Sequence, residues 1–203
     1  MKEIYEEYQG FSDLYIAEIT KDDLEGYTTG APEVLAPAGE ITKSTATDSA
    51  VKYYDNQPYF TSNSEGSDEI QLIVPILPIS KLAKITGKTI DAETGTLLDD
   101  GEAKTKYFAL LYKLMFQDGT YRWVCRSKGS FAVGDESSKS KDDSTDTNNQ
   151  TLTFTGIATV HKFDKTGKPS KAIIADDHDE LCDTSTWYTE VPTPDNIKAK
   201  ISV

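Results

Sequence analysis

A Gly-Lys-Thr run at residues 87–89 is the first place where the residue types could carry chemistry, because a phosphate-binding P-loop ends in these residues. The complete motif also needs a glycine five positions before Gly87, where this chain has Leu82. It further needs a helix after the loop, whereas the helical pattern here precedes Gly87. We therefore interpret Gly87 as the end of a short helix and not as part of a nucleotide site.

Residues 91–102 place acidic side chains at the first, third, ninth and twelfth positions of a calcium-binding loop. The frame fails in its middle, because Gly95 stands where an oxygen ligand belongs and Thr96 stands where a glycine belongs. This pattern favours a solvated acidic turn. The acidic residues of the frame are Asp91, Glu93, Asp99 and Glu102.

The acidic run at residues 176–180 contains His178 and precedes Cys182, and these residue types can bind metals. The run is local and has no second histidine or rigid scaffold nearby. We interpret it as an exposed charge run and leave open whether it holds an ion. The other histidine, His161, is predicted to lie on a strand among threonines, satisfied by a neighbouring group.

Nucleophilic catalysis has no recognisable signature in this chain. It has neither a Gly-x-Ser-x-Gly elbow nor a Cys/His pair with the spacing of a known family. We predict no catalytic residue, no cofactor, no metal site and no enzymatic activity.

Four aromatic residues flank a long polar segment and are the strongest candidates for a contact surface. Tyrosine is enriched in protein interfaces, and a long polar segment with aromatic residues in its middle is usually functional. The alternative is that the rings form a small satellite core. We predict protein–protein contacts at six residues, namely Tyr53, Tyr54, Asp55, Asn56, Tyr59 and Phe60.

The composition limits the classes of protein to which the chain can belong. Its 203 residues suffice for one domain with a buried core and no disulfide framework. Acidic residues number 34 and basic residues 21, and the resulting net charge of -13 repels phosphates, which argues against tight binding of nucleic acid.

The two ends and the cysteines give expectations about the compartment. The N-terminus has no apolar run of the kind that a signal peptide needs, and the longest apolar stretch, residues 70–79, is too short to cross a membrane. We therefore expect assembly in a cytosol, with Cys125 and Cys182 reduced and Cys125 acting as a small apolar residue.

The first third of the chain predicts extended structure. Residues 13–20 indicate a strand covered on both faces, because Leu14 and Ile16 on one face alternate with apolar residues on the other. Residues 41–54 are rich in Thr, Ser and Ala and indicate one or two strands with thin apolar content. Residues 55–69 indicate a long loop or an extended arm.

A strand and a short helix follow. Residues 70–76 alternate as a strand, with Pro75 marking an edge or a bulge. Residues 80–87 predict a two-turn helix in which Ser80 is the N-cap, Leu82 and Ile85 face inward, and Gly87 ends the helix.

The clearest hairpin pairs residues 107–116 with residues 120–127 around Asp118 and Gly119, both predicted at positive φ. Further strands are expected at residues 151–163, with Gly156 marking a bulge, and at residues 171–175. Two segments complete the chain, a disordered polar loop at residues 134–150 and an acidic C-terminal extension at residues 176–203.

These elements together predict one domain over residues 1–203. Its expected fold is all-β (β-rich α+β), an antiparallel β-sandwich or partial barrel with one short helix and long polar loops.

In this order, the elements resemble the major tail tube protein of long-tailed, non-contractile bacteriophages, in the branch common among phages of Gram-positive bacteria. The resemblance spans nearly the whole chain and lacks the C-terminal immunoglobulin-like domain that some relatives carry. Its motifs are DLYIAE at 13–18, LAPAG at 35–39, YDN at 54–56, LAKITG at 82–87, LYK at 111–113, DGTYR at 118–122 and LTFTGIA at 152–158.

The resemblance implies a structural virion protein of the phage tail that is assembled in the cytoplasm of the host bacterium. Such proteins form hexameric rings that stack into a hollow tube around a tape-measure protein, between the tail terminator and the baseplate or distal tail proteins. Their sheets join between subunits, and a long arm packs against the neighbouring ring. DNA leaves through the lumen without tight binding, and the family implies no catalysis, no cofactor and no membrane.

Two other functions stay open. One is a tail terminator or connector protein of related β fold, which would be present in far fewer copies than a tube protein. The other is a non-viral β-sandwich binding module, secreted or on a surface, that binds carbohydrate or a host partner. The lack of a signal-peptide pattern argues against this second alternative.

Overall fold

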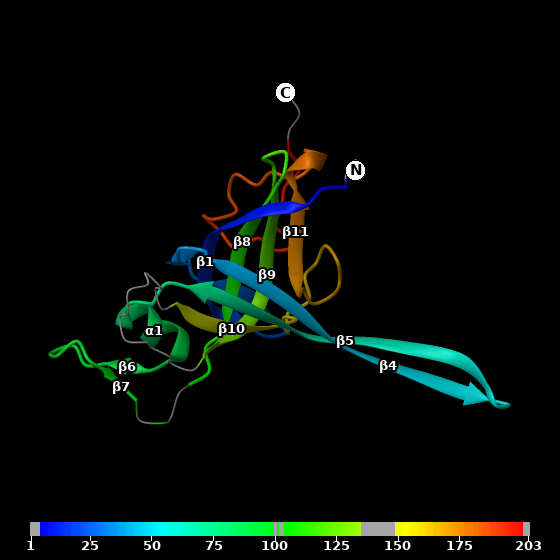
Figure 1. Ribbon diagram of the computed structural model, residues 1–203, viewed down its shortest axis with the longest axis horizontal. Coiled ribbons are helices and arrows are strands. Elements are labelled where there is room, and N and C mark those ends of the chain that lie inside the picture. Colours follow the sequence, from blue (N-terminus) through cyan, green and yellow to red (C-terminus); the bar gives the residue numbers. More distant parts are fainter. Residues whose placement is uncertain (1–4, 100, 102–103, 135–148, 201–203) are drawn as a thin grey trace, which may run out of the picture.

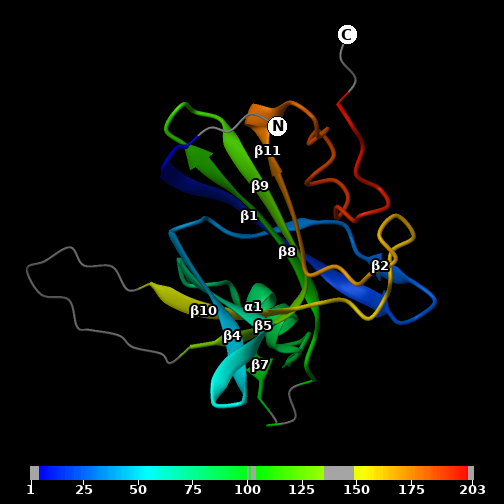
Figure 2. The same ribbon diagram turned by 90° about the vertical axis from the view of Figure 1, so that its right-hand side faces the viewer.

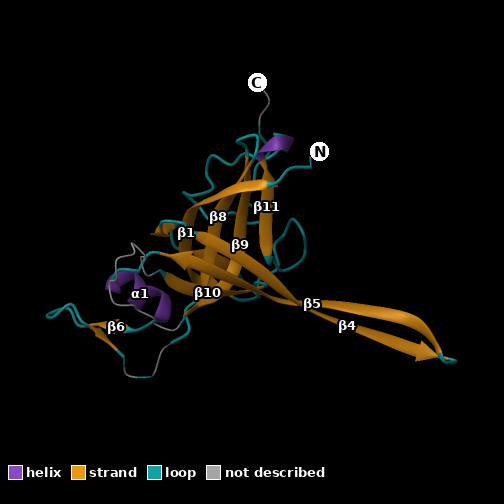
Figure 3. Cartoon of the chain, viewed as in Figure 1, coloured by secondary structure: helices purple, strands orange, loops and turns teal. Residues whose placement is uncertain are grey.

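A computed structural model of the chain describes residues 5–99, 101, 104–134 and 149–200. One large antiparallel sheet dominates it, with the strand order β2-β1-β8-β9-β10-β5-β4, while β3 pairs with β1 and β11 pairs with β9. A small β6–β7 hairpin, the helix α1 and the 3-10 helix η1 are the other elements of the described part (Figures 1 and 3). The predicted all-β fold class is confirmed.

The strands are β1 (Tyr8–Asp22), β2 (Tyr27–Thr29), β3 (Glu33–Ala36), β4 (Glu40–Tyr54), β5 (Gln57–Val74), β6 (Thr89–Ile90), β7 (Leu97–Leu98), β8 (Phe108–Phe116), β9 (Tyr121–Val133), β10 (Gln150–Ile157) and β11 (Ala172–Asp176). The helices are α1 (Ile79–Thr86) and η1 (Asp177–Asp179). The strand β9 is long enough to pair with β8 on one edge and with β10 and β11, end to end, on the other.

The main core lies inside the curl of this sheet. Phe108 and Leu110 of β8 are fully buried against Leu72 of β5 and Phe154 of β10, and α1 adds Ile85. In Figure 2 the β10–β5–β4 portion crosses the β1–β8–β9 portion, so that a single sheet faces itself across the core. This arrangement is a partial barrel, in which alternate residues of each strand fill the interior.

The strand β1 is covered on both faces, as its pattern predicts. Leu14 and Ile16 belong to the main core, whereas Ala17 is buried in a second apolar cluster on the opposite face of the sheet. Successive side chains of a strand point to opposite faces. A strand that is apolar at successive positions is therefore covered on both faces.

The C-terminal segment forms the layer that covers this second face. Trp187 and Val191 are each 2% exposed and pack against Leu111 and Cys125 of the sheet. The segment predicted as a C-terminal extension is therefore, as far as residue 200, an integral layer of the body. The buried Cys125 acts as a small apolar residue, as expected, and both cysteines are free.

The helix α1 corrects part of the sequence prediction. Its N-cap is Pro78 and no side chain caps it, so the assignment of Ser80 as N-cap was wrong. Ile85 is buried as predicted, but Leu82 is only half-buried, and Ala83 takes the second inward position. The helix ends at Gly87 in the left-handed conformation (φ 71°), as predicted.

Three smaller predictions about strands were also wrong. The strand β5 ends at Val74, so Pro75 lies just outside it. The strand β10 ends at Ile157 and pairs without a register shift on both edges, so Gly156 marks no bulge. At the β8–β9 turn only Gly119 has a positive φ (85°), because the turn closes by a hydrogen bond from Phe116 N to Thr120 O and is longer than two residues. Of the polar loop predicted at residues 134–150, residues 135–148 lie outside the described part of the chain.

Candidate functional site

The most prominent feature of the molecule is a two-stranded ribbon that projects from the body (Figure 1). We call residues 46–66, the distal parts of β4 and β5, the arm. Cross-strand pairs run from Thr47 with Glu65 to Tyr54 with Gln57, which gives a length of about 25 Å at the usual rise of a β-strand. Every residue of the arm is exposed. Of the predicted segment 55–69, residues 57–66 are therefore strand within the arm and residues 67–69 are strand within the body, so the loop interpretation was wrong.

A two-residue turn forms the tip of the arm. Asp55 (φ 50°) and Asn56 (φ 62°) both adopt the left-handed conformation between the paired residues Tyr54 and Gln57. A tight hairpin needs two residues at positive φ, and Asp and Asn tolerate this conformation better than other non-glycine residues.

Three of the four aromatic residues singled out in the sequence gather at this tip. The ring centroids of Tyr54, Tyr59 and Phe60 lie 4.8 to 6.1 Å apart, in edge-to-face contacts. The exposed fractions of these residues are 56%, 69% and 57%. Tyr53 is 65% exposed and makes no ring contact with these three residues in the described structure.

The arm is poorly suited to standing alone in water. A single two-stranded ribbon is marginally stable without a further strand or a packed face. Its shaft carries Ser, Thr, Asn and Asp side chains on both faces, so it has no apolar face that could pack on the body. An exposed aromatic cluster on such a support indicates a surface that another molecule covers.

A buried ionic cluster holds the arm where it leaves the body. The carboxylate of Asp68, a residue only 1% exposed, lies 2.9 Å from Arg126 Nη1, 2.9 Å from Lys171 Nζ and 3.4 Å from Lys43 Nζ. The hydroxyl of Thr45 also donates to it at 2.8 Å. Burial alone would raise the pKa of Asp68, but these hydrogen bonds and positive charges outweigh it and hold the pKa below its ordinary value.

Lys171 joins the base of the arm to the body. Its ammonium group donates to Glu65 Oε1 at 2.9 Å and to the carbonyl of Gly66 at 2.7 Å. Desolvation lowers the pKa of Lys171, and its hydrogen bonds to Glu65 and Asp68 more than reverse that effect. The strands also shift register between Thr45 and Thr47. The arm therefore begins at a bulge, which the ion pairs of Asp68 and Lys171 stabilise.

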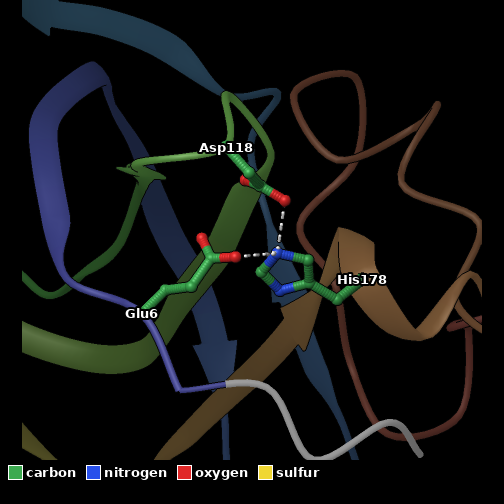
Figure 4. Close-up of side chains that lie close together, drawn as sticks. All are labelled: Glu6, Asp118 and His178. Carbon is green, nitrogen blue, oxygen red and sulfur yellow. Dashed lines mark hydrogen bonds and ion pairs between the residues drawn. The ribbon is translucent and has the colours of Figure 1, made fainter.

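The structure separates the residues of the acidic run at 176–180. Asp176 makes two hydrogen bonds of 2.6 Å to Arg122, and Asp177 accepts from the indole of Trp123 at 2.8 Å. Cys182 packs beside the second apolar cluster. His178 instead faces Glu6 and Asp118, which come from distant parts of the chain (Figure 4). The local metal cluster considered from the sequence is therefore not formed.

The other sequence motifs have local roles. The carboxylate of Asp91 accepts hydrogen bonds from the backbone of Glu93 and the hydroxyl of Thr94, which fits the predicted acidic turn. The prediction for His161 was wrong, since its buried Nδ1 atom has no hydrogen-bond partner among the described residues and its ring packs edge-on against Phe163 at 5.0 Å.

One cavity of about 570 Å³ opens between β1, β4, β8 and β9. Phe11, Ile41 and Leu114 give it apolar walls, and Arg122 and Arg126 reach it. Both guanidinium groups are ion-paired, Arg122 with Asp176 and Arg126 with Asp68, although the buried Nε atom of Arg126 has no hydrogen-bond partner among the described residues. The arm therefore remains the candidate site that the geometry favours.

Among the described residues, no helix has the length and apolar character that a bilayer crossing requires. No protein-family model and no curated protein matches this chain.

Proposed function

We propose that this protein is the structural subunit of a phage tail tube, which polymerises as stacked hexameric rings. The observation that carries the proposal is the arm, an exposed ribbon with an aromatic tip and a braced base. In the assembled tube the tip packs against the neighbouring ring through Tyr53, Tyr54, Asp55, Asn56, Tyr59 and Phe60. Contact there would remove the exposed rings from water and give the ribbon the support that it lacks alone.

The open edges of the sheet support the ring. The sheet ends at β2 and at β4, and each has a partner on one edge only within the described residues. Unpaired edges are a liability for a monomer, because they present free backbone donors and acceptors to other strands. Head-to-tail pairing of such edges between identical copies closes into a ring when the rotation permits.

The net negative charge of the chain supports the proposed passage of DNA through the tube. A net charge of -13 per subunit disfavours tight contact with phosphates, and this repulsion extends over roughly 8 Å at physiological salt. The proposed role is structural, in the virion, with the tape-measure, terminator and baseplate proteins as partners and with no catalysis, cofactor or membrane.

The proposal predicts self-assembly that depends on the arm. Negative-stain electron microscopy of the concentrated purified protein should show rings or hollow rods. Replacing residues 48–64 by Asn-Gly should leave a folded subunit that forms no rods, because the ionic base, including Glu65, stays intact while the contact surface is lost. Rods of normal length from this variant would refute the role of the arm.

A triple variant isolates the aromatic contact. Tyr54→Ser, Tyr59→Ser and Phe60→Ser together should shorten or abolish the rods without changing the melting temperature of the subunit. Tyr5→Ser is the matched control, because Tyr5 is 93% exposed and lies outside the arm.

Featureless monomers under all conditions would contradict the tube proposal itself. Single rings that do not stack would favour the terminator alternative, and a positive glycan screen with a monomeric protein would favour the binding module.

A further inference from the structure

Glu6, Asp118 and His178 converge at one end of the sheet (Figure 4). The Nε2 atom of His178 lies 2.8 Å from Asp118 Oδ2 and 3.7 Å from Glu6 Oε1, and the three donor atoms all lie within 4.8 Å of one another. The residues come from the segment before β1, from the β8–β9 turn and from η1, so only the folded chain brings them together.

Neighbouring groups hold two of the three side chains in place. The imidazole of His178 is only 10% exposed and packs against the ring of Phe116 at a centroid distance of 4.7 Å. Asp118 accepts hydrogen bonds from the hydroxyl and the backbone N–H of Thr120, at 2.7 and 2.8 Å.

The cluster has more hydrogen-bond acceptor atoms than hydrogens that can be donated to them. The Thr120 hydroxyl donates to Asp118, so it presents its oxygen to His178 Nε2, which lies 2.7 Å away. That nitrogen carries at most one hydrogen and faces this oxygen and two carboxylates. In addition, Glu6 Oε2 is buried and has no hydrogen-bond partner among the described residues. His178 Nε2 can therefore donate to only one of these three oxygens, and the remaining lone pairs are what a bound cation would satisfy.

We propose that Glu6, Asp118 and His178 form a binding site for a divalent transition-metal cation of the zinc type. Ligands about 2.1 Å from a tetrahedral ion are about 3.4 Å apart, and the separations of 2.8 and 3.7 Å bracket this value. An imidazole nitrogen with two carboxylates suits Zn²⁺ or its neighbours, whereas Mg²⁺ and Ca²⁺ prefer oxygen ligands alone. Water would take the fourth position.

The metal would have a structural role, and this role does not depend on whether the protein forms tubes. It would join the N-terminal segment to the β8–β9 turn and to η1, where the C-terminal layer begins. A ligand that binds only the folded state raises its stability by mass action. At a hundredfold excess over the dissociation constant, we expect the melting temperature to rise by about 5–10 °C for a chain of this size.

Calorimetric titration of the EDTA-treated full-length protein with zinc chloride at pH 7 tests the site. We expect one saturable site per chain, with no comparable binding of magnesium. His178→Gln and Glu6→Gln should each weaken zinc binding about 100-fold or more, since even groups that only orient a metal ligand contribute 10–100-fold. Glu7→Gln is the matched control, because it removes the same charge from the adjacent exposed residue and should leave the affinity unchanged.

A second measurement needs no variant for its main result. The chain has two histidines, so zinc should shift the ring signals of one of them, His178, in the NMR spectrum of the wild-type protein. Absence of saturable binding up to 1 mM zinc would overturn the proposal. So would equal loss in Glu7→Gln and Glu6→Gln, or a zinc-induced shift confined to His161.

Discussion

Asp68→Asn should destabilise the protein strongly, because it removes the negative charge from a buried cluster of three cations. The Arg126 side chain is only 9% exposed, whereas the Lys43 and Lys171 side chains, at 34% and 23%, can turn outward into solvent. The dominant cost is therefore one buried, uncompensated guanidinium. Removing one partner of a buried ion pair lowers the free energy of unfolding by about 3–5 kcal/mol. Because the two lysine side chains can turn into solvent, we expect a loss near ~3 kcal/mol.

Urea denaturation at pH 7 measures this loss, which corresponds to a fall of about 6–12 °C in melting temperature for a chain of this size. Glu69→Gln is the matched control. It removes the adjacent charge, but Glu69 is exposed and its side chain accepts a hydrogen bond from the exposed Gln71, so we expect a change within about 0.5 kcal/mol.

The pH dependence gives an independent check. The pKa of Asp68 is lowered in the folded state, so its stabilisation is complete above the unfolded pKa of about 3.9 and is lost as the pH falls through the folded value. The difference between wild type and Asp68→Asn should therefore narrow steadily below about pH 4. A difference under about 1 kcal/mol at pH 7, or one that persists undiminished in strong acid, would refute the reasoning.

Three further predictions concern the body. Gly87→Ala should lower the melting temperature, because φ is 71° there and a Cβ would collide with the carbonyl of Lys104; the expected cost is at least about 1 kcal/mol. Trp187→Ala should cost about 3–5 kcal/mol in urea denaturation if the C-terminal layer is part of the core, since Trp187 is 2% exposed. Cys125 is fully buried, and burial raises the pKa of its thiol to about 12, so a thiol reagent at pH 8 should label only Cys182 in the native protein.

The body strands could be predicted because burial leaves a regular pattern in the sequence. Leu14 and Ile16 of β1, and Phe108 and Leu110 of β8, each face the core at alternate positions. The end of α1 was equally readable, because only glycine adopts the conformation of Gly87 without strain. These predictions use interactions within one element, which depend on local spacing alone.

The arm could be predicted only in part. The sequence predicted the strand at residues 41–54 and the contact residues at the tip, but the residues after Asn56 lack the alternation of polar and apolar side chains that marks a strand. The C-terminal layer was missed for a related reason. Trp187 and Val191 are isolated apolar residues in irregular backbone, and only their contact with the far face of the sheet shows that they belong to a core.

By itself, the sequence determined the fold class, the net negative charge and the aromatic residues that the arm carries, because alternation, net charge and residue content are properties of short segments or of totals. Only the tertiary structure decided which charges meet. Asp68 meets Arg126 from β9, and His178 meets Glu6 and Asp118 across most of the chain. Such contacts depend on how a curved sheet brings distant strands together, and no local spacing encodes that distance.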